Sequence, residues 1–187
     1  FNILAGTSLG NRRLEVAGIG NFTKEEIKGV QVGGIFNELR GDLRGVQLAG
    51  IYNRSGDTLS GLQVGGIVNR ARHSAGAASQ IGGIANYSRS GTVLLQVGGI
   101  NNQLDGNLQG LQVAGLFNRI SDTLSGVQVA GMVNRTRQVS GAAVQVAGLS
   151  NHIQSGTLSL QVAGIANTAD SVDGIQVACI VNRARKV

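Results

Sequence analysis

One unit of about sixteen residues recurs along almost the whole 187-residue chain. The unit reads aliphatic-Gln-Val-Ala/Gly-Gly-Ile/Leu-x-Asn, as in residues 144–151. Its closing Asn residues stand at positions 21, 37, 53, 69, 86, 102, 118, 134, 151, 167 and 182. A unit this short cannot bury its apolar side alone, so it is stable only when it stacks on its neighbours. The repeat therefore predicts an all-β fold: a single β-solenoid (β-helix) of about eleven 16-residue coils, stacked in parallel, with an internal Asn ladder.

The repeat also predicts the domain organisation. Residues 1–187 are expected to form one repeat array, with a weak N-terminal unit over 1–21, regular coils over 22–182 and a C-terminal tail over 183–187. A longer period lies on top of the short one, since residues 68–72 recur as residues 133–137, 65 positions later. This longer period indicates that four units were duplicated together.

The side chains of each unit can be assigned to faces from their alternation along a strand. In Val30-Gln31-Val32 the two Val share one face and Gln31 takes the other. The position of Ile35 holds an aliphatic residue in every unit, which favours an interior position, and the small pair Gly33-Gly34 permits a corner before it. We therefore expect the Ile column inside and the Gln column as an outward ladder that forms a flat polar face. The Gln column comprises Gln31, Gln47, Gln63, Gln80, Gln96, Gln112, Gln128, Gln145, Gln161 and Gln176.

The Asn column is expected to point inward. A buried Asn needs partners for both ends of its amide, and an Asn at the same place in every coil can bond to the Asn above and below. The predicted ladder comprises Asn37, Asn53, Asn69, Asn86, Asn102, Asn118, Asn134, Asn151, Asn167 and Asn182.

Arg residues recur at the first and third positions after the closing Asn, and the net charge is +6. Stacked coils would gather them along one edge, where guanidinium groups bind phosphate, sulfate or carboxylate in a bidentate manner. The candidate anion-binding edge comprises Arg54, Arg70, Arg72, Arg119, Arg135, Arg137, Arg183 and Arg185. An anionic glycan or a protein is the expected partner, and the alternative is an edge that only keeps the rod solvated. Nucleic acid is not favoured, because aromatic residues that could stack on bases make up only 3% of the chain.

The sequence carries no recognisable catalytic, metal or cofactor motif. His73 and His152 lie at non-equivalent places without spaced ligand partners, and the Gly-Gly pairs do not match a phosphate-binding Gly-x-Gly-x-x-Gly. Cys179 stands alone, so an intrachain disulfide is excluded. No stretch approaches 18 uninterrupted apolar residues, which excludes a transmembrane helix. We expect no catalytic residue, no metal and no cofactor.

The units at 127–134 and 144–151 resemble the tandem units of bacterial surface-repeat proteins, and the resemblance extends from about Leu14 to Asn182. It implies an exported protein at the bacterial cell surface or in the periplasm, and it transfers no catalytic residue. We expect the chain to be a mature or trimmed fragment, from which targeting information has been removed. Cys179 departs from the Gly of the other units and marks a changed last coil.

These features favour a non-enzymatic structural or binding module that presents a flat Gln-lined face and a basic Arg edge to a partner. Two alternatives remain open. One is a small outer-membrane β-barrel in which each unit supplies one strand and a turn, and the other is a carbohydrate-active enzyme built on a β-helix. Exposed end coils also suggest end-to-end or side-by-side association of copies of the chain.

Overall fold

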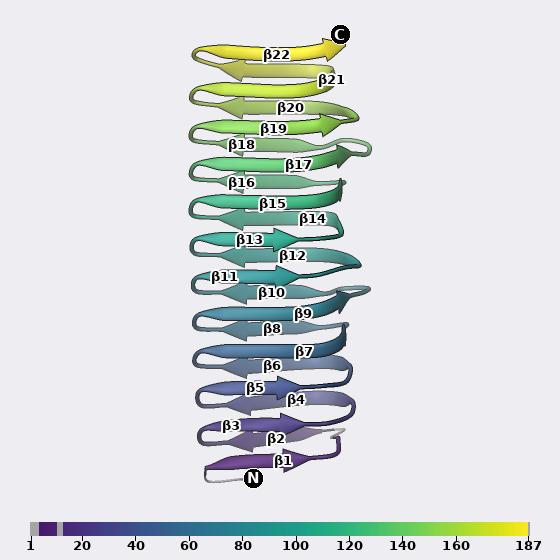
Figure 1. Ribbon diagram of the computed structural model, residues 1–187, viewed down its shortest axis with the longest axis vertical. Coiled ribbons are helices and arrows are strands. Elements are labelled where there is room, and N and C mark those ends of the chain that lie inside the picture. The colour runs from purple at the N-terminus through teal and green to yellow at the C-terminus, as the bar shows by residue number, and fades with distance from the viewer. Residues whose placement is uncertain (1–3, 11–12, 187) are drawn as a thin grey trace.

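The computed structural model describes residues 4–10 and 13–186. Within these residues the chain forms twenty-two β-strands and no helix, and every strand pairing is parallel. The strands stack as about eleven turns of roughly sixteen residues, so the predicted β-solenoid is confirmed. Figure 1 shows the turns piled in a straight column with the two termini at opposite ends.

Each turn contributes one strand to each of two facing stacks. The Asn sheet carries the Asn column. It comprises β1 (Ala5–Ser8), β3 (Gly20–Thr23), β5 (Phe36–Leu39), β7 (Tyr52–Leu59), β9 (Val68–Ser74), β11 (Ala85–Ser88), β13 (Asn101–Leu104), β15 (Phe117–Leu124), β17 (Val133–Val139), β19 (Ser150–Ser155) and β22 (Val181–Lys186).

The Gln sheet carries the Gln column. It comprises β2 (Leu14–Ala17), β4 (Ile27–Gly33), β6 (Leu43–Ala49), β8 (Leu62–Gly65), β10 (Ser79–Gly82), β12 (Thr92–Gly98), β14 (Asn107–Ala114), β16 (Val127–Ala130), β18 (Val144–Ala147) and β20 (Thr157–Ala163). The long strand β21 (Ala166–Ala178) passes through both sheets, pairing with β19 and β22 on one side of the rod and with β20 on the other. The ends of β7 and β15 also reach the Gln sheet, where Leu59 pairs with Leu43 and Leu124 with Leu108.

The register places equivalent residues of successive turns directly over one another. Gln31 pairs with Gln47 between β4 and β6, and Asn37 pairs with Asn53 between β5 and β7. Each strand thus pairs in parallel with the strand one turn away, whereas the barrel alternative requires antiparallel pairing of consecutive strands. That alternative is therefore wrong. The residues expected as a tail after 182 instead continue strand β22, where Arg183 pairs with Thr168. No helix in the described part of the chain is long and apolar enough to cross a membrane.

The predicted orientation of two columns is wrong. Gln31 is fully buried, and so are the equivalent Gln residues as far as Gln161, whereas Ile35 is 44% exposed at the corner between the two sheets. The two Val that flank Gln31 point outward and are partly exposed. The corner explains the result: the chain reverses direction over Gly34 and Ile35, so Ile35 lies on the outer side of the bend and Asn37 returns to the interior.

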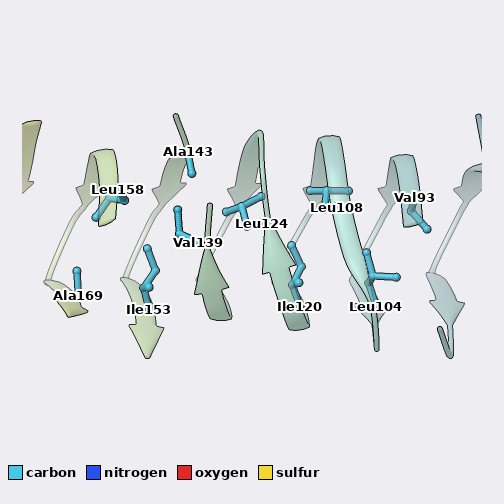
Figure 2. Close-up of a cluster of buried hydrophobic side chains, with 10 residues drawn as sticks. All are labelled: Val93, Leu104, Leu108, Ile120, Leu124, Val139, Ala143, Ile153, Leu158 and Ala169. Carbon is cyan, nitrogen blue, oxygen red and sulfur yellow. The ribbon is translucent and has the colours of Figure 1, made fainter. Parts of the chain in front are cut away.

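The interior has a polar half next to this corner and an aliphatic half next to the longer turns. In the aliphatic half, side chains of the two sheets point toward one another (Figure 2). The larger cluster comprises Val93, Leu104, Leu108, Ile120, Leu124, Val139, Ala143, Ile153, Leu158 and Ala169. The smaller one comprises Ile27, Leu39, Leu43, Leu59, Ala71 and Ala78. The buried Ser74 and Ser88 lie where aliphatic residues stand in other turns, and their hydroxyl groups are hydrogen-bonded at 2.7 Å.

The second Gly of each corner has no room for a side chain. A Cβ at Gly99 would collide with the carbonyl oxygen of Gly83 in the turn before, and the same collision recurs in the other turns. The first Gly is different, because a Cβ at Gly98 would meet Asn102 Oδ1 at 2.7 Å and the carbonyl oxygen of Asn101 at 2.8 Å, both within its own turn. Ala114 holds a methyl group at the equivalent place in the next turn, so a small local shift is enough to admit one. Stacking of the regular turns therefore requires Gly at only the second of the two positions, and in the last corner Cys179 stands there, with its N–H donating to the carbonyl oxygen of Gly164 at 3.3 Å.

The two glycines provide a matched pair of variants. Gly99→Ala is expected to lower the free energy of unfolding by about 1–3 kcal/mol, because two turns must move apart to admit the methyl group. Gly98→Ala is expected to change it by less than about 1 kcal/mol. Urea unfolding followed by circular dichroism measures both values. Equal losses for the two variants would contradict a steric requirement confined to the second glycine.

Candidate functional site

The candidate Arg residues lie on the outer face of the Asn sheet. Alternation explains this placement: Asn69 and Ala71 point inward, so Arg70 and Arg72 point outward and are exposed on β9. Arg135 and Arg137 occupy the equivalent outward positions on β17. The first and third positions after the Asn therefore share one face of the sheet. The sequence had predicted that the Arg residues form an edge of the rod, and the structure places them on this face instead.

Parallel register brings the Arg residues together in two groups. Arg54 pairs with Arg70, and Arg119 pairs with Arg135, each one turn apart. The N-terminal Arg cluster, comprising Arg54, Arg70, Arg72 and Arg89, lines a shallow hollow of about 200 Å³. The C-terminal Arg cluster, comprising Arg119, Arg135 and Arg137, lines a second hollow of about 220 Å³ together with His152. Arg183 and Arg185 lie on β22 and line neither hollow.

Most of the guanidinium groups in the two clusters lack an acidic partner. Arg54 forms an ion pair of 2.9 Å with Glu38. None of the other cluster residues has a carboxylate of a described residue within 4.0 Å. Their positive charge is therefore free to act on a ligand.

Burial and the neighbouring Arg charges both act on His152 in the second hollow. Burial lowers the pKa of His152, and the charges of Arg135 and Arg185 lower it further. A lowered pKa keeps the imidazole neutral at pH 7. The three Arg side chains of the C-terminal cluster therefore supply the positive charge of that hollow.

A larger hollow of about 360 Å³ adjoins the N-terminal Arg cluster. It is lined by Tyr52, Val68 and Tyr87, with Arg70 and Arg89 at its basic side. Burial raises the pKa of Tyr52, and the nearby Glu38 raises it further. Asp105 also lines this hollow, so aromatic surface, guanidinium groups and one carboxylate surround it together.

The buried polar columns form two continuous hydrogen-bonded ladders. Each Asn donates from Nδ2 to Oδ1 of the next Asn, as from Asn37 to Asn53 at 2.9 Å, and the expected Asn ladder is present from Asn21 to Asn182. Each Gln donates from Nε2 to Oε1 of the preceding Gln, as from Gln47 to Gln31 at 2.7 Å. The Gln column is therefore an internal ladder, so the outward Gln-lined face predicted from the sequence does not exist.

Other candidate chemistry lies apart from the Arg clusters. No group of three His, Cys, Asp or Glu side chains with the arrangement of a metal site occurs among residues 4–10 and 13–186. Cys179 is exposed and unpaired in the last corner. Arg89 and His152 also line the Arg hollows but were not among the predicted site residues. The repeat could have indicated both, because Arg89 stands three residues after Asn86 and His152 directly follows Asn151.

These features define the class of the molecule: a parallel β-solenoid with internal Asn and Gln ladders and basic clusters on one sheet. No protein-family description, curated protein or solved structure matches the chain.

Proposed function

We propose that the chain is a non-enzymatic structural or binding module of an exported, surface-displayed protein, and that its two Arg clusters bind an anionic glycan. The single observation that supports binding is the group of outward guanidinium groups that are stacked one turn apart and that, apart from Arg54, have no acidic partner among the described residues. The exported setting rests on the resemblance to bacterial surface-repeat proteins. Since the Gln column is buried, the Arg face alone carries this proposal.

The geometry suits a polymer with repeated negative charges. Equivalent residues of adjacent turns are roughly 4.8 Å apart. Guanidinium groups bind sulfate, phosphate and carboxylate through paired hydrogen bonds. A glycan that crosses several turns would contact both clusters at once, and such multivalent contact raises its overall affinity.

Charge reversal in each cluster tests the proposal. Arg70→Glu/Arg72→Glu and Arg135→Glu/Arg137→Glu are each expected to weaken binding to heparin, used as a sulfated glycan, and to lipopolysaccharide by at least about tenfold. The reason is that each double variant replaces attraction by repulsion at one hollow. Binding of the unaltered chain should also weaken as salt is added. Isothermal titration calorimetry measures these affinities.

The matched control changes the same charge elsewhere. Lys28→Glu/Arg44→Glu also replaces two cations by two anions, at exposed side chains near the starts of β4 and β6 on the Gln sheet. It is expected to leave most of the affinity intact. An equal loss in the control would attribute binding to net charge alone, and no loss in either cluster variant would make the Arg face a solvating surface. Release of sugar products from the same glycans would contradict the non-enzymatic part of the proposal.

A further inference from the structure

The outer face of the Gln sheet is apolar along the whole rod on the side next to the corner, whereas Lys28 and Arg44 lie at its other side. The two residues that flank the buried Gln in each turn point outward and are partly exposed. They comprise Leu14, Val16, Val30, Val32, Val46, Leu48, Leu62, Val64, Ser79, Ile81, Leu95, Val97, Leu111, Val113, Val127, Val129, Val144, Val146, Leu160, Val162, Ile175 and Val177. We call this surface the apolar face. Ser79 is its only polar member, and it has no charged member.

The Ile column widens this face at the corner. Ile35, Ile51 and Ile100 are each 44% exposed, and equivalent aliphatic residues flank the apolar face from turn to turn. Behind the apolar face lies the polar Gln ladder. A strand normally places its apolar side inside and its polar side in water. The Gln sheet has the reverse arrangement, so most of its apolar side chains gain no burial within one chain.

We propose that the apolar face binds the apolar face of a second copy of this chain, so that two solenoids pack sheet against sheet. The size of the face supports this partner. Eleven strands of the Gln sheet at roughly 4.8 Å, over a width of roughly 15 Å, give on the order of 750 Å² per copy. Two such faces bury on the order of 1,500 Å², which matches a stable protein interface, whereas monomers rarely expose apolar patches above about 600 Å².

The shape of the face also fits a second copy. The turns stack in a straight column, so the strands of the Gln sheet succeed one another without a bend along the rod (Figure 1). Two such faces have the same turn-to-turn spacing, and paired sheets pack about 10 Å apart with interdigitating side chains. A two-fold axis makes the same patch complementary to itself.

The charge distribution favours a second copy over a lipid surface. Both Arg clusters lie on the Asn sheet, so in the proposed dimer they point away from the interface and remain free. Lys28 and Arg44, near the starts of β4 and β6, are paired with Glu26. A membrane held at the apolar face would meet few of the basic residues that attract anionic lipid. The dimer is independent of glycan binding, because the two use opposite sheets.

Sedimentation velocity tests the proposal at micromolar concentrations of the whole chain. Reducing agent must be present, because the exposed Cys179 could otherwise form a disulfide between copies. The expected mass is about twice 19.2 kDa. Val97→Lys/Val129→Lys, at the middle of the apolar face, is expected to weaken dimerisation by at least about tenfold, because it buries unpaired charges at the interface.

The matched control is Val68→Lys/Val133→Lys, at partly exposed outward positions of the Asn sheet. It is expected to remain dimeric, and far-ultraviolet circular dichroism checks that both variants fold. A wild-type chain that stays monomeric would overturn the proposal, and so would a dimer broken only by the control. Flotation of a monomeric chain with phosphatidylcholine vesicles would identify a membrane as the occupant. Heparin binding is measured on the same variant. If Val97→Lys/Val129→Lys no longer dimerises but still binds heparin, the loss lies in the dimer interface and the glycan site is intact.

Discussion

Gln112→Glu is expected to lower the free energy of unfolding at pH 7 by about 4 kcal/mol, which corresponds to a pKa raised by about three units at a buried carboxyl. The Nε2 group of Gln112 donates to Oε1 of Gln96 at 2.7 Å, and its Oε1 accepts from Gln128 at 2.8 Å. An ionised Glu at this position can still accept from Gln128. It has no proton to donate to Gln96, so two oxygens face one another in a buried site.

This loss should depend on pH in a defined direction. The pKa of the introduced Glu is about 4.3 in the unfolded chain and higher in the folded chain, because burial and the Gln96 oxygen disfavour the charged form. The native state therefore binds more protons than the unfolded state between the two pKa values. Stability of the variant, relative to wild type, is expected to be greatest below about pH 4.3, to fall as pH rises through that window, and to be constant above the folded-state pKa.

Urea unfolding of wild type and variant across this pH range measures the effect. Gln112→Met is the control, since it removes the same hydrogen bonds without adding a titratable group, and its loss should not change with pH. A loss for Gln112→Glu that is equally independent of pH would contradict the burial of the introduced carboxyl between two amide groups of the Gln ladder.

The chain itself contains a carboxylate where the ladder tolerates one. Glu15 occupies the Gln column at its N-terminal end and accepts from Gln31 at 3.0 Å and from the hydroxyl of Thr23 at 2.9 Å. Because every Gln donates toward the preceding turn, the first member of the column needs only to accept. A group that only accepts is suited to that end and unsuited to the middle.

Asn102→Ala is expected to lower the free energy of unfolding by about 3–6 kcal/mol, the cost of leaving two or three buried polar groups unpaired and opening a small cavity. Asn102 is fully buried and accepts from Asn86 at 2.8 Å. It donates to Asn118 Oδ1 at 3.0 Å and to the carbonyl oxygen of Val113 at 2.6 Å. No water can replace these partners without opening the stack.

Asn182→Ala is the control for this prediction. Asn182 ends the ladder, is exposed, and accepts from Asn167 at 3.0 Å. Because water can replace the missing group there, the expected loss is below about 1 kcal/mol. Urea unfolding of both variants provides the comparison. Similar losses at 102 and 182 would show that the ladder bonds in the middle of the rod contribute no more than bonds exposed to solvent.

The repeat predicted the fold correctly because its period carries topological information. An identical Asn at steps of 15–17 residues requires equivalent positions to be superposed, and superposition of short strands at that separation produces parallel coils. The Asn ladder followed from the same reasoning. Gln31 and its equivalents recur as strictly as the Asn residues, and this recurrence also indicates a buried ladder. A buried amide needs hydrogen-bond partners at fixed places, whereas a solvated amide can bond to water.

The orientation of the Ile column could not be obtained from its composition. An aliphatic residue in every turn is compatible with a core and equally with a continuous apolar surface that a partner covers. The decisive fact is the place of Ile35 on the outer side of a bend, which depends on how tightly Gly33 and Gly34 turn the backbone. Periodicity locates this bend only approximately.

The grouping of the Arg residues was predictable only in part. Alternation placed Arg70 and Arg72 on one face, and the repeat stacked them with their equivalents. Arg89 joins the N-terminal cluster because it stands three residues after Asn86, as Arg72 does after Asn69, and these two Asn residues are paired. The repeat does not specify which of these side chains line a common hollow, because that depends on the sizes and orientations of their neighbours.

The opposite directions of the two ladders determine the electric polarity of the rod. An amide side chain carries a dipole, and a line of aligned amides would sum to a macroscopic moment, as peptide groups do in a helix. The Gln line is oriented toward the N-terminus and the Asn line toward the C-terminus, so their axial moments largely cancel. Since the backbone of a sheet contributes only a small net dipole, lengthening the array by further turns would not build up opposite charge at its ends.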